Sequence, residues 1–393
     1  MAKYAIDSTT LTGIADAIRE KAGTTGGIAT SQMAESILAI KGGLALDVVT
    51  ASALPGTVVD GQIVVESTTP ANHVYITTDE PATAEVGDIL IAIEPGAEIR
   101  WELTDETSFI RGGLAYAAQW NGTTWVICEA YYGVAGAWEQ FSTTLPPVGT
   151  PLESMPWSDI AKIAKAGKGA DYFKVGDKKS VPVSGTVGSD TISGTRYCKI
   201  IGINHNKSIE GNGIHFQFLW NGSDNPMAWD YGHGTTGQGY MMNSSNSNVG
   251  GWQSSYMRNT LCATFLTRLP AEMQAAIKEC RKYTDNTGNA NSSDATKVTE
   301  TKDKIFLLSE YEVFGSAGYG NAGEKDYQAQ YEYYAAGNRK NRYRVRSTSN
   351  LCNWWLRSAH RASTNKYVAV DTYGSIMVGE AYYSYGFAPC FMV

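Results

Sequence analysis

The chain of 393 residues is too long for one ordinary hydrophobic core, so two or three domains are expected. Only 18% of the residues are charged, and the 41 Gly and 23 Tyr residues argue for a loop-rich protein and against a disordered chain or a coiled-coil rod. The net charge of −7 argues against a nucleic-acid partner and against binding to an anionic membrane.

Residues 1–43 predict two short amphipathic helices. Apolar residues recur at helical spacing in two stretches, at Leu11, Ile14, Ala15 and Ile18 and again at Met33, Ile37 and Ile40. Ser and Thr residues precede each stretch as candidate caps, and glycines follow both. Helices this short cannot bury their apolar stripes alone. The segment is therefore expected to pack against other copies of the chain or against another protein.

Residues 44–150 predict a small β domain. Apolar runs at 62–65, 74–76 and 88–93, and a hairpin around residues 121–122, are typical of strands. Four tryptophans are expected to supply aromatic core, namely Trp101, Trp120, Trp125 and Trp138. We interpret the domain as a spacer, or neck. A sugar-stacking site on its tryptophans is the alternative.

Residues 151–393 follow a proline-rich linker at 145–151 and predict a larger domain, so the whole chain is expected to be α+β. The expected elements are a helix over 157–167, strands over 197–203 and 214–220, a helix over 269–280 and a strand over 304–308. In the second strand, His215 and Gln217 alternate with Phe216 and Phe218. Loops are expected at 231–251 and 286–297.

The stretch 319–346 is predicted to be a long insert. It carries several tyrosines and five cations within eight residues, which are Arg339, Lys340, Arg342, Arg344 and Arg346. A solvated loop is one interpretation of this stretch, and a grip on an acidic glycan is the other.

The C-terminal end combines two apolar anchors with a polar segment between them. Trp354-Trp355 and residues 389–393 carry enough apolar surface to be buried. The segment between them is dense in Tyr, Ser, Asn and Asp, a composition typical of binding surfaces. Tyr367 and Ala369 share one parity while Val368 and Val370 share the other, which predicts a strand with one inward and one outward face.

Three ordered motifs carry a resemblance to a known family. GGWQSSYMR at 250–258, DKIFLLSEYEVF at 303–314 and WWLRS at 354–358 resemble a domain-of-unknown-function family with a C-type-lectin-like fold. That family is related to formylglycine-generating enzymes and to the variable proteins of diversity-generating retroelements. The resemblance covers the chain from about Met155 to its end.

The ending GFAPCF at 386–391 is similar to that of retroelement-diversified phage proteins, in which positions between the two anchors vary. The resemblance implies ligand-binding positions at His360, Ser363, Lys366, Tyr367, Ala369, Asp371, Tyr373, Ser375, Met377, Gly379, Tyr382, Tyr383 and Tyr385.

The N-terminal segment carries a second resemblance. LTGIADAIR at 11–19 with TSQMA at 30–34 closely resembles the attachment segment of tail proteins from phages of Gram-positive bacteria. The resemblance implies a virion protein that residues 1–43 attach or oligomerise, as a homotrimer like most tail fibres, and whose partners include other phage tail proteins. A helical hairpin of another role is the alternative. Residues 1–7 lack the apolar core of a signal peptide and no apolar run could span a bilayer, so we expect synthesis in the host cytoplasm without export or membrane insertion.

The sequence offers few candidates for a catalytic or metal-binding motif, so no cofactor and no metal are expected. His73, His205, His215, His233 and His360 lack metal-ligand spacing. GHGTTG at 232–237 resembles a dinucleotide motif, but no helix is predicted after it. The carbohydrate-binding loops of calcium lectins and the cysteine motif of formylglycine-generating enzymes do not occur. The cysteines are expected to be buried thiols, with a Cys352–Cys390 disulfide left open.

These observations predict a phage tail-fibre receptor-binding protein, and not an enzyme. The C-terminal segment would adhere to a bacterial surface receptor, either glycan or protein, and weak sites would gain by avidity. The alternatives are an enzyme acting on surface polysaccharide, a formylglycine-generating-like oxidase and a cellular adhesion protein of similar fold.

Overall fold

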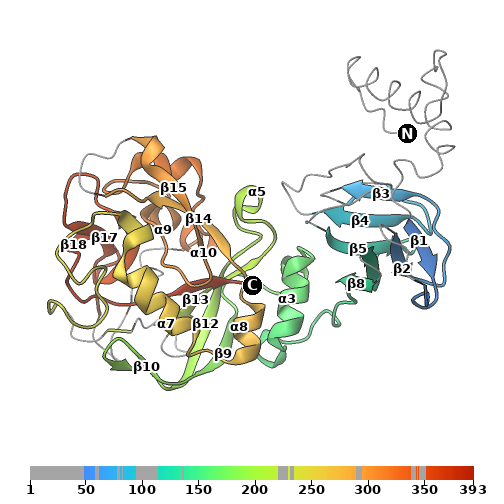
Figure 1. Ribbon diagram of the computed structural model, residues 1–393, viewed down its shortest axis with the longest axis horizontal. Helices are drawn as coiled ribbons and strands as arrows, with labels where there is room; N and C mark the ends of the chain where they lie inside the picture. The colour runs from blue at the N-terminus through green and yellow to red at the C-terminus, as the bar shows by residue number, and fades with distance from the viewer. Residues whose placement is uncertain are drawn as a thin grey trace, which may run out of the picture. The chain divides into compact units, whose positions relative to one another are not determined.

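The chain divides into two compact units, Met1–Thr144 and Leu145–Val393. The computed structural model (Figure 1) describes residues 48–57, 62–77, 80–81, 83–93, 114–134, 137–219, 229–230, 234–288, 294–337, 342, 344 and 351–393. The two predicted helices within 1–43 lie outside these residues, and so does Trp101. The division between the units falls at the start of the proline-rich segment 145–151. Both helices and strands are present, and the fold class is α+β as predicted.

The N-terminal unit contains two four-stranded sheets, ordered β1-β2-β7-β8 and β3-β4-β5-β6. Their strands are β1 Val48–Ala51, β2 Ile63–Glu66, β3 Val74–Thr77, β4 Ile89–Ile93, β5 Leu114–Trp120, β6 Trp125–Cys128, β7 Ala130–Val134 and β8 Ala137–Ser142. Three strands lie where apolar runs predicted them, and β5 and β6 form the predicted hairpin with Trp120 opposite Trp125.

The two sheets of this unit share an aliphatic core. Ile63 from β2, Ile89 and Ile91 from β4 and Ala117 from β5 are fully buried in one cluster. Trp120 and Trp138 are only partly buried, so the prediction that they supply the core is wrong. The small, branched side chains of alternate strand positions already fill the space between the sheets.

The C-terminal unit is built around the antiparallel sheet β19-β13-β12-β9. Its strands are β9 Lys178–Val183, β12 Gly194–Ile203, β13 Ile214–Leu219 and β19 Cys390–Met392. A second sheet, β16-β17-β18, comprises Trp354–Ala359, Lys366–Val370 and Ile376–Glu380, and β14 Cys280–Asp285 pairs with β15 Val298–Asp303. β10 Thr186–Val187 and β11 Asp190–Thr191 form a short ribbon.

Short helices surround these sheets. The α-helices are α3 Trp157–Lys165, α4 Gly169–Tyr172, α5 Lys207–Glu210, α6 Gly251–Ser254, α7 Ala263–Leu266, α8 Ala271–Ala276, α9 Glu310–Phe314 and α10 Glu332–Ala335. A π-helix, η2 Met257–Cys262, and three 3-10 helices, η1 Leu152–Ser154, η3 Ala295–Lys297 and η4 Ala322–Asp326, complete the described elements. The predicted helix over 157–167 is α3, whose apolar positions Trp157, Ile160 and Ile163 are buried.

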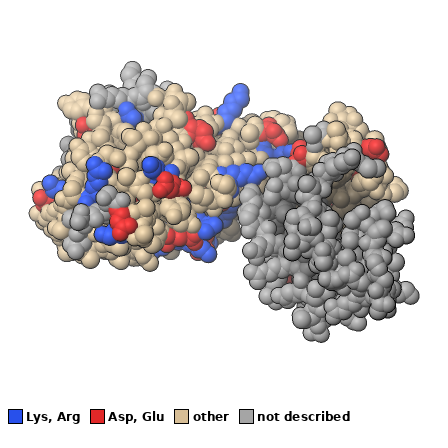
Figure 2. All heavy atoms as spheres, turned by 90° about the horizontal axis from the view of Figure 1, so that it is seen from above, with Lys and Arg blue, Asp and Glu red and all other residues tan. Residues whose placement is uncertain are grey.

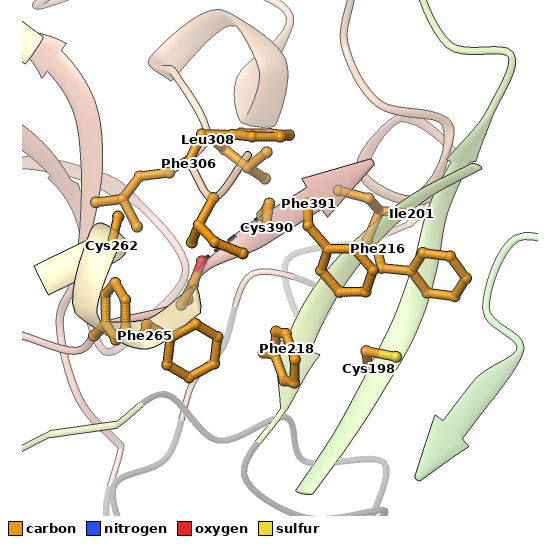
Figure 3. Packing of buried hydrophobic residues seen from close by; sticks show 14 of the residues in the cluster. Cys198, Ile201, Phe216, Phe218, Cys262, Phe265, Phe306, Leu308, Cys390 and Phe391 are labelled. Carbon is orange, nitrogen blue, oxygen red and sulfur yellow. Dashed lines mark hydrogen bonds between the residues drawn. The ribbon is translucent and has the colours of Figure 1, made fainter. Parts of the chain in front are cut away.

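Strand β13 alternates as predicted, but both of its faces are buried. On one face, Phe216 stacks on Phe391 with ring centroids 5.0 Å apart (Figure 3). Trp157 meets Phe216 edge-on at 5.6 Å. On the other face, His215 and Gln217 are also fully buried. A polar residue at an alternate strand position therefore does not mark a solvent-facing side here.

Two predicted elements are displaced. Cys280, expected at a helix end, begins β14, and the strand expected over 304–308 lies instead at Val298–Asp303. The sequence of β15 is polar and gives no alternating signal, whereas Ile305 to Leu308 are apolar because they pack in the core. Phe306 makes an isolated bridge to Cys390.

The stretch 319–346 is not simply a solvated insert. Tyr331 and Tyr334 are core residues, and the guanidinium of Arg344 is fully buried. Arg344 Nη2 donates to Gln217 Oε1 at 2.5 Å and to Tyr334 Oη at 2.6 Å. Arg344 therefore cannot hold an external glycan. Arg339, Lys340 and Arg346 lie outside the described residues.

None of the six cysteines forms a disulfide, and five of them, including Cys352 and Cys390, are buried.

The helices of the described residues include none that is long and apolar enough to cross a membrane.

Candidate ligand-binding face

The two anchors of the C-terminal segment are structural, as predicted. Trp354 and Trp355 are fully buried, and their indole nitrogens donate to the carbonyls of Arg342 and Tyr240 at 2.9 and 2.8 Å. The last residues form β19, which pairs with β13. The segment between the anchors is thus tied to the core at both ends.

Strand β17 departs from the predicted pattern. Tyr367, Val368, Ala369 and Val370 are all fully buried, so the expected outward face does not exist in this strand. β17 is the central strand of its sheet, and the Tyr367 hydroxyl donates to the carbonyl of Gly251 in α6 at 2.9 Å. The sheet is covered on both sides, which parity alone cannot reveal.

Four of the thirteen predicted positions are buried, namely Tyr367, Ala369, Gly379 and Tyr385. Tyr385 packs on Trp355 with ring centroids 4.6 Å apart. A Cβ added at Gly379 would lie 2.6 Å from the Trp355 ring, so this packing requires glycine. These four positions therefore belong to the packing beneath the face.

The remaining positions fall into two groups at opposite ends of the β17–β18 hairpin. Asp371, Tyr373 and Ser375 lie in its turn, with Met377 close by on β18. At the other end, where Lys366 lies opposite Glu380, the structure brings together a set that we call the receptor face: His360, Ser363, Lys366, Tyr382 and Tyr383. The strand length separates the two groups by roughly 15 Å.

The loop at 234–248 forms part of the receptor face. Gly237 N donates to the Tyr382 carbonyl at 3.0 Å, and Thr236 bridges to Tyr383. The Tyr382 and Tyr383 rings stack with centroids 5.2 Å apart. The sequence predicts a loop over 231–251 and carries no signal for its contact with these tyrosines.

A buried asparagine organises the hairpin loop of residues 360–366. Asn248 is fully buried, and its side-chain nitrogen donates to the carbonyls of Ser363 at 2.7 Å and Lys366 at 3.0 Å. The loop backbone is therefore fixed from below while its side chains remain partly exposed. An isolated Asn in a polar stretch gives no signal of this role in the sequence.

The three motifs that carry the family resemblance meet through buried ionic contacts. Trp252 Nε1 and Arg258 Nε, from the first motif, donate to Asp303 at 3.0 and 2.6 Å. Arg357 of the WWLRS motif pairs with Glu312 of the second motif. Trp252, Asp303, Glu312 and Arg357 of the three motifs are buried, and their contacts hold the unit together.

Glu312 and Arg357 belong to what we call the Lys282 cluster, which consists of Lys282, Glu210, Glu312, Tyr331 and Arg357. Lys282 Nζ lies 3.0 Å from both carboxylate oxygens of Glu210, from Glu312 Oε1 and from Tyr331 Oη. Burial disfavours ionisation of Glu312, but Arg357 and Lys282 outweigh it and lower its pKa to about 2. The buried charges compensate one another.

Among the described residues, Glu210, His215 and Cys280 place potential metal-ligand atoms within 4.8 Å of one another. Lys282 already supplies the positive charge beside Glu210, and Tyr331 Oη lies 2.9 Å from His215 Nδ1. Burial lowers the pKa of His215 well below its usual value. Within this set, the Glu210 carboxylate and His215 Nδ1 already contact protein groups, and Cys280 Sγ donates to Glu210 Oε2 at 2.7 Å.

The comparisons with known proteins identify one domain. Residues 235–393 match DUF6273, a domain of unknown function. The matched region includes the receptor face, whereas β9, β12 and β13 precede it. No curated protein and no solved structure matches the chain.

Proposed function

We propose that this protein is a receptor-binding protein of a phage tail, which adheres to a bacterial surface ligand through the receptor face. The observation that carries the proposal is the gathering of partly exposed Tyr, Ser, His and Lys side chains on loops fixed by a buried scaffold. Tyrosine supplies contact area at low entropic cost, and such residues dominate binding surfaces. The phage context rests on the resemblances at both ends of the sequence.

The burial of the reactive groups supports binding and not turnover. His215 and Cys280 are fully buried, as are Cys352 and Cys390, which are the cysteines nearest the C-terminus. A nucleophile or base needs access to substrate. The accessible residues of the receptor face instead offer aromatic surface and hydrogen-bonding groups.

Surface charge favours a specific face over general electrostatic attraction. Figure 2 shows basic and acidic side chains interspersed on the viewed face of the C-terminal unit, with wide uncharged areas between them. A trimer formed through residues 1–43 would carry three such faces, so modest single-site affinity would suffice for adhesion.

The test is binding of the purified full chain to candidate host cells, with a Tyr382→Ala/Tyr383→Ala variant. We expect the variant to lose about tenfold or more in apparent affinity, because stacked interface tyrosines are frequent hot spots. Tyr373→Ala is the matched control, since Tyr373 is 68% exposed in the hairpin turn at the other end of β17–β18.

Equal binding by the double variant and the parent would reject this location. A loss confined to Tyr373→Ala would move the face to the hairpin turn. If the protein binds none of the candidate host cells but releases sugars from their cell walls, the adhesion proposal is rejected in favour of an enzymatic function. Circular dichroism and oligomeric state of each variant show whether it is folded.

A further inference from the structure

Tyr319 lies beside the receptor face although the sequence places it 41 residues before His360. Its ring stacks on the His360 ring, with centroids 5.6 Å apart and an interplanar angle of 29°. Tyr319 is 40% exposed. The Arg361 backbone nitrogen donates to the Tyr319 carbonyl at 2.8 Å, which joins the two loops. The pair therefore combines an exposed aromatic ring with the hairpin loop of residues 360–366.

A buried carboxylate holds Tyr319 in place. Glu310 is fully buried and accepts the backbone N–H groups of Gly318, Tyr319 and Gly320, with Tyr319 N 3.0 Å from Oε2. The Glu310 backbone nitrogen in turn donates to Ser358 Oγ at 3.0 Å. The aromatic ring is thus presented by a fixed loop, which reduces the entropic cost of binding.

Two cations, Arg361 and Lys366, flank the pair. Within the described part of the chain, neither the Arg361 guanidinium nor the Lys366 ammonium makes a hydrogen bond or a direct ion pair. Glu380 lies opposite Lys366 on β18 but accepts from Asn246 Nδ2 at 3.1 Å. Burial raises the pKa of Glu310, and the positive charge of Arg361 opposes this rise. The Glu310 carboxylate itself is buried below the surface. Burial, Lys366 and Arg361 together lower the pKa of His360, so the imidazole is expected to be neutral at pH 7.

A second stacked pair in the same unit provides a contrast. Tyr283 and Tyr327 stack with centroids 4.5 Å apart, and Tyr327 is 36% exposed. The neighbouring Arg281, however, donates to Glu300 Oε2 at 2.7 Å. Its charge is already compensated within the protein. The Tyr319 pair differs because, among the described residues, the cations beside it make no direct hydrogen bond to a carboxylate.

We propose that Tyr319, His360, Arg361 and Lys366 form a subsite for a sugar ring that bears an anionic substituent, so that the receptor is an acidic glycan. Tyr319 packs against the apolar face of the ring, and Arg361 and Lys366 bind its carboxylate or phosphate. This inference rests on the proposed adhesion function and specifies its ligand class.

The experiment measures retention of the full chain on immobilised polygalacturonic acid and on its carboxyl-reduced, neutral counterpart, and on phosphomannan beside neutral mannan. We expect retention on at least one acidic polymer, weakening as salt rises, and none on the neutral polymers. The carboxylate and phosphate arms show which anion the subsite prefers.

Arg361→Gln/Lys366→Gln and Tyr319→Ala are each expected to weaken this retention by about tenfold or more. The control variants Arg281→Gln and Tyr327→Ala are expected to stay within about twofold of the parent, because they alter the compensated pair.

Equal retention on acidic and neutral polymers, no retention on either acidic polymer, or unchanged retention by the Arg361→Gln/Lys366→Gln variant would overturn the subsite. Binding to host cells separates this failure from that of the broader proposal. If the cells are bound while the acidic polymers are not, adhesion stands and the acidic ligand is rejected. If neither is bound, both proposals fall.

Discussion

The Lys282 cluster and the hairpin loop of residues 360–366 both carry cations, yet the protein surrounds them differently. Lys282 and Arg357 contact Glu210 and Glu312, with all four side chains buried. Among the described residues, the side chains of Arg361 and Lys366 make no direct ion pair with a carboxylate. Buried charged side chains need partners because removing them from water is costly. Charged side chains at the surface stay hydrated and need no partner within the protein. Direct pairing therefore separates the charges that hold the unit together from those of the hairpin loop.

Removing a charge from the Lys282 cluster should have the largest effect on stability. Glu312→Gln keeps the side-chain size but removes the charge that Arg357 and Lys282 contact, and we expect it to lower the free energy of unfolding by about 3–5 kcal/mol. Urea denaturation measures the change. The control Glu300→Gln, which weakens the partly exposed pair with Arg281, should cost less than about 1 kcal/mol. Similar costs for both variants would contradict the contrast.

A buried carboxyl group beside the same cluster should make stability depend on pH. Burial raises the pKa of Glu324 to about 7 from an ordinary value of 4.5. The folded protein then keeps a proton that the unfolded chain releases, so this stabilisation is full below pH 4.5 and is lost as the pH rises through about 7.

Glu324→Gln should remove up to about 3 kcal/mol of that pH dependence. Unfolding of the parent and the variant at pH 4.5, 6 and 8 measures the difference between them. The Gln side chain retains an acceptor for Asp285 N or Ser358 Oγ, the two groups that donate to Glu324. Parallel stability curves for the two proteins would show that folding does not shift the pKa of Glu324.

The support beneath the face can be tested at Gly379. Gly379→Ala brings a Cβ against Trp355 and should destabilise the C-terminal unit by about 1–3 kcal/mol through overpacking. Gly56→Ala, where a Cβ meets no atom within 4 Å, is the control and should change the melting temperature little. A stable Gly379→Ala protein would reopen position 379 as a variable, ligand-contacting site.

The smallest effect is expected at the exposed end of the hairpin. Tyr373 is 68% exposed, so Tyr373→Ala should change the free energy of unfolding by no more than about 0.5 kcal/mol. Thermal unfolding gives the value. A larger loss would mean that the turn packs against another part of the protein, and that it is not a free surface.

Patterns within a few residues of the sequence determined several features correctly. The helical spacing of Trp157, Ile160 and Ile163 predicted α3, and the run of Trp354 and Trp355 predicted a buried anchor. The asparagine and glycine at residues 121–122 predicted the β5–β6 hairpin. Each signal depends on local backbone geometry or on the hydrophobicity of adjacent side chains, which the chain carries without reference to distant segments.

Tertiary structure alone decided which polar residues are buried and which meet at the receptor face. Tyr367 was predicted to face outward, but α6 covers it, and Gln217 faces Tyr334 from a segment more than one hundred residues away. Tyr319 reaches His360 only because Glu310 folds its loop back. The exposure of a side chain depends on what packs against its face of the strand. The alternation of residues along a strand is the same whether that face meets water or protein, so the sequence pattern does not distinguish the two.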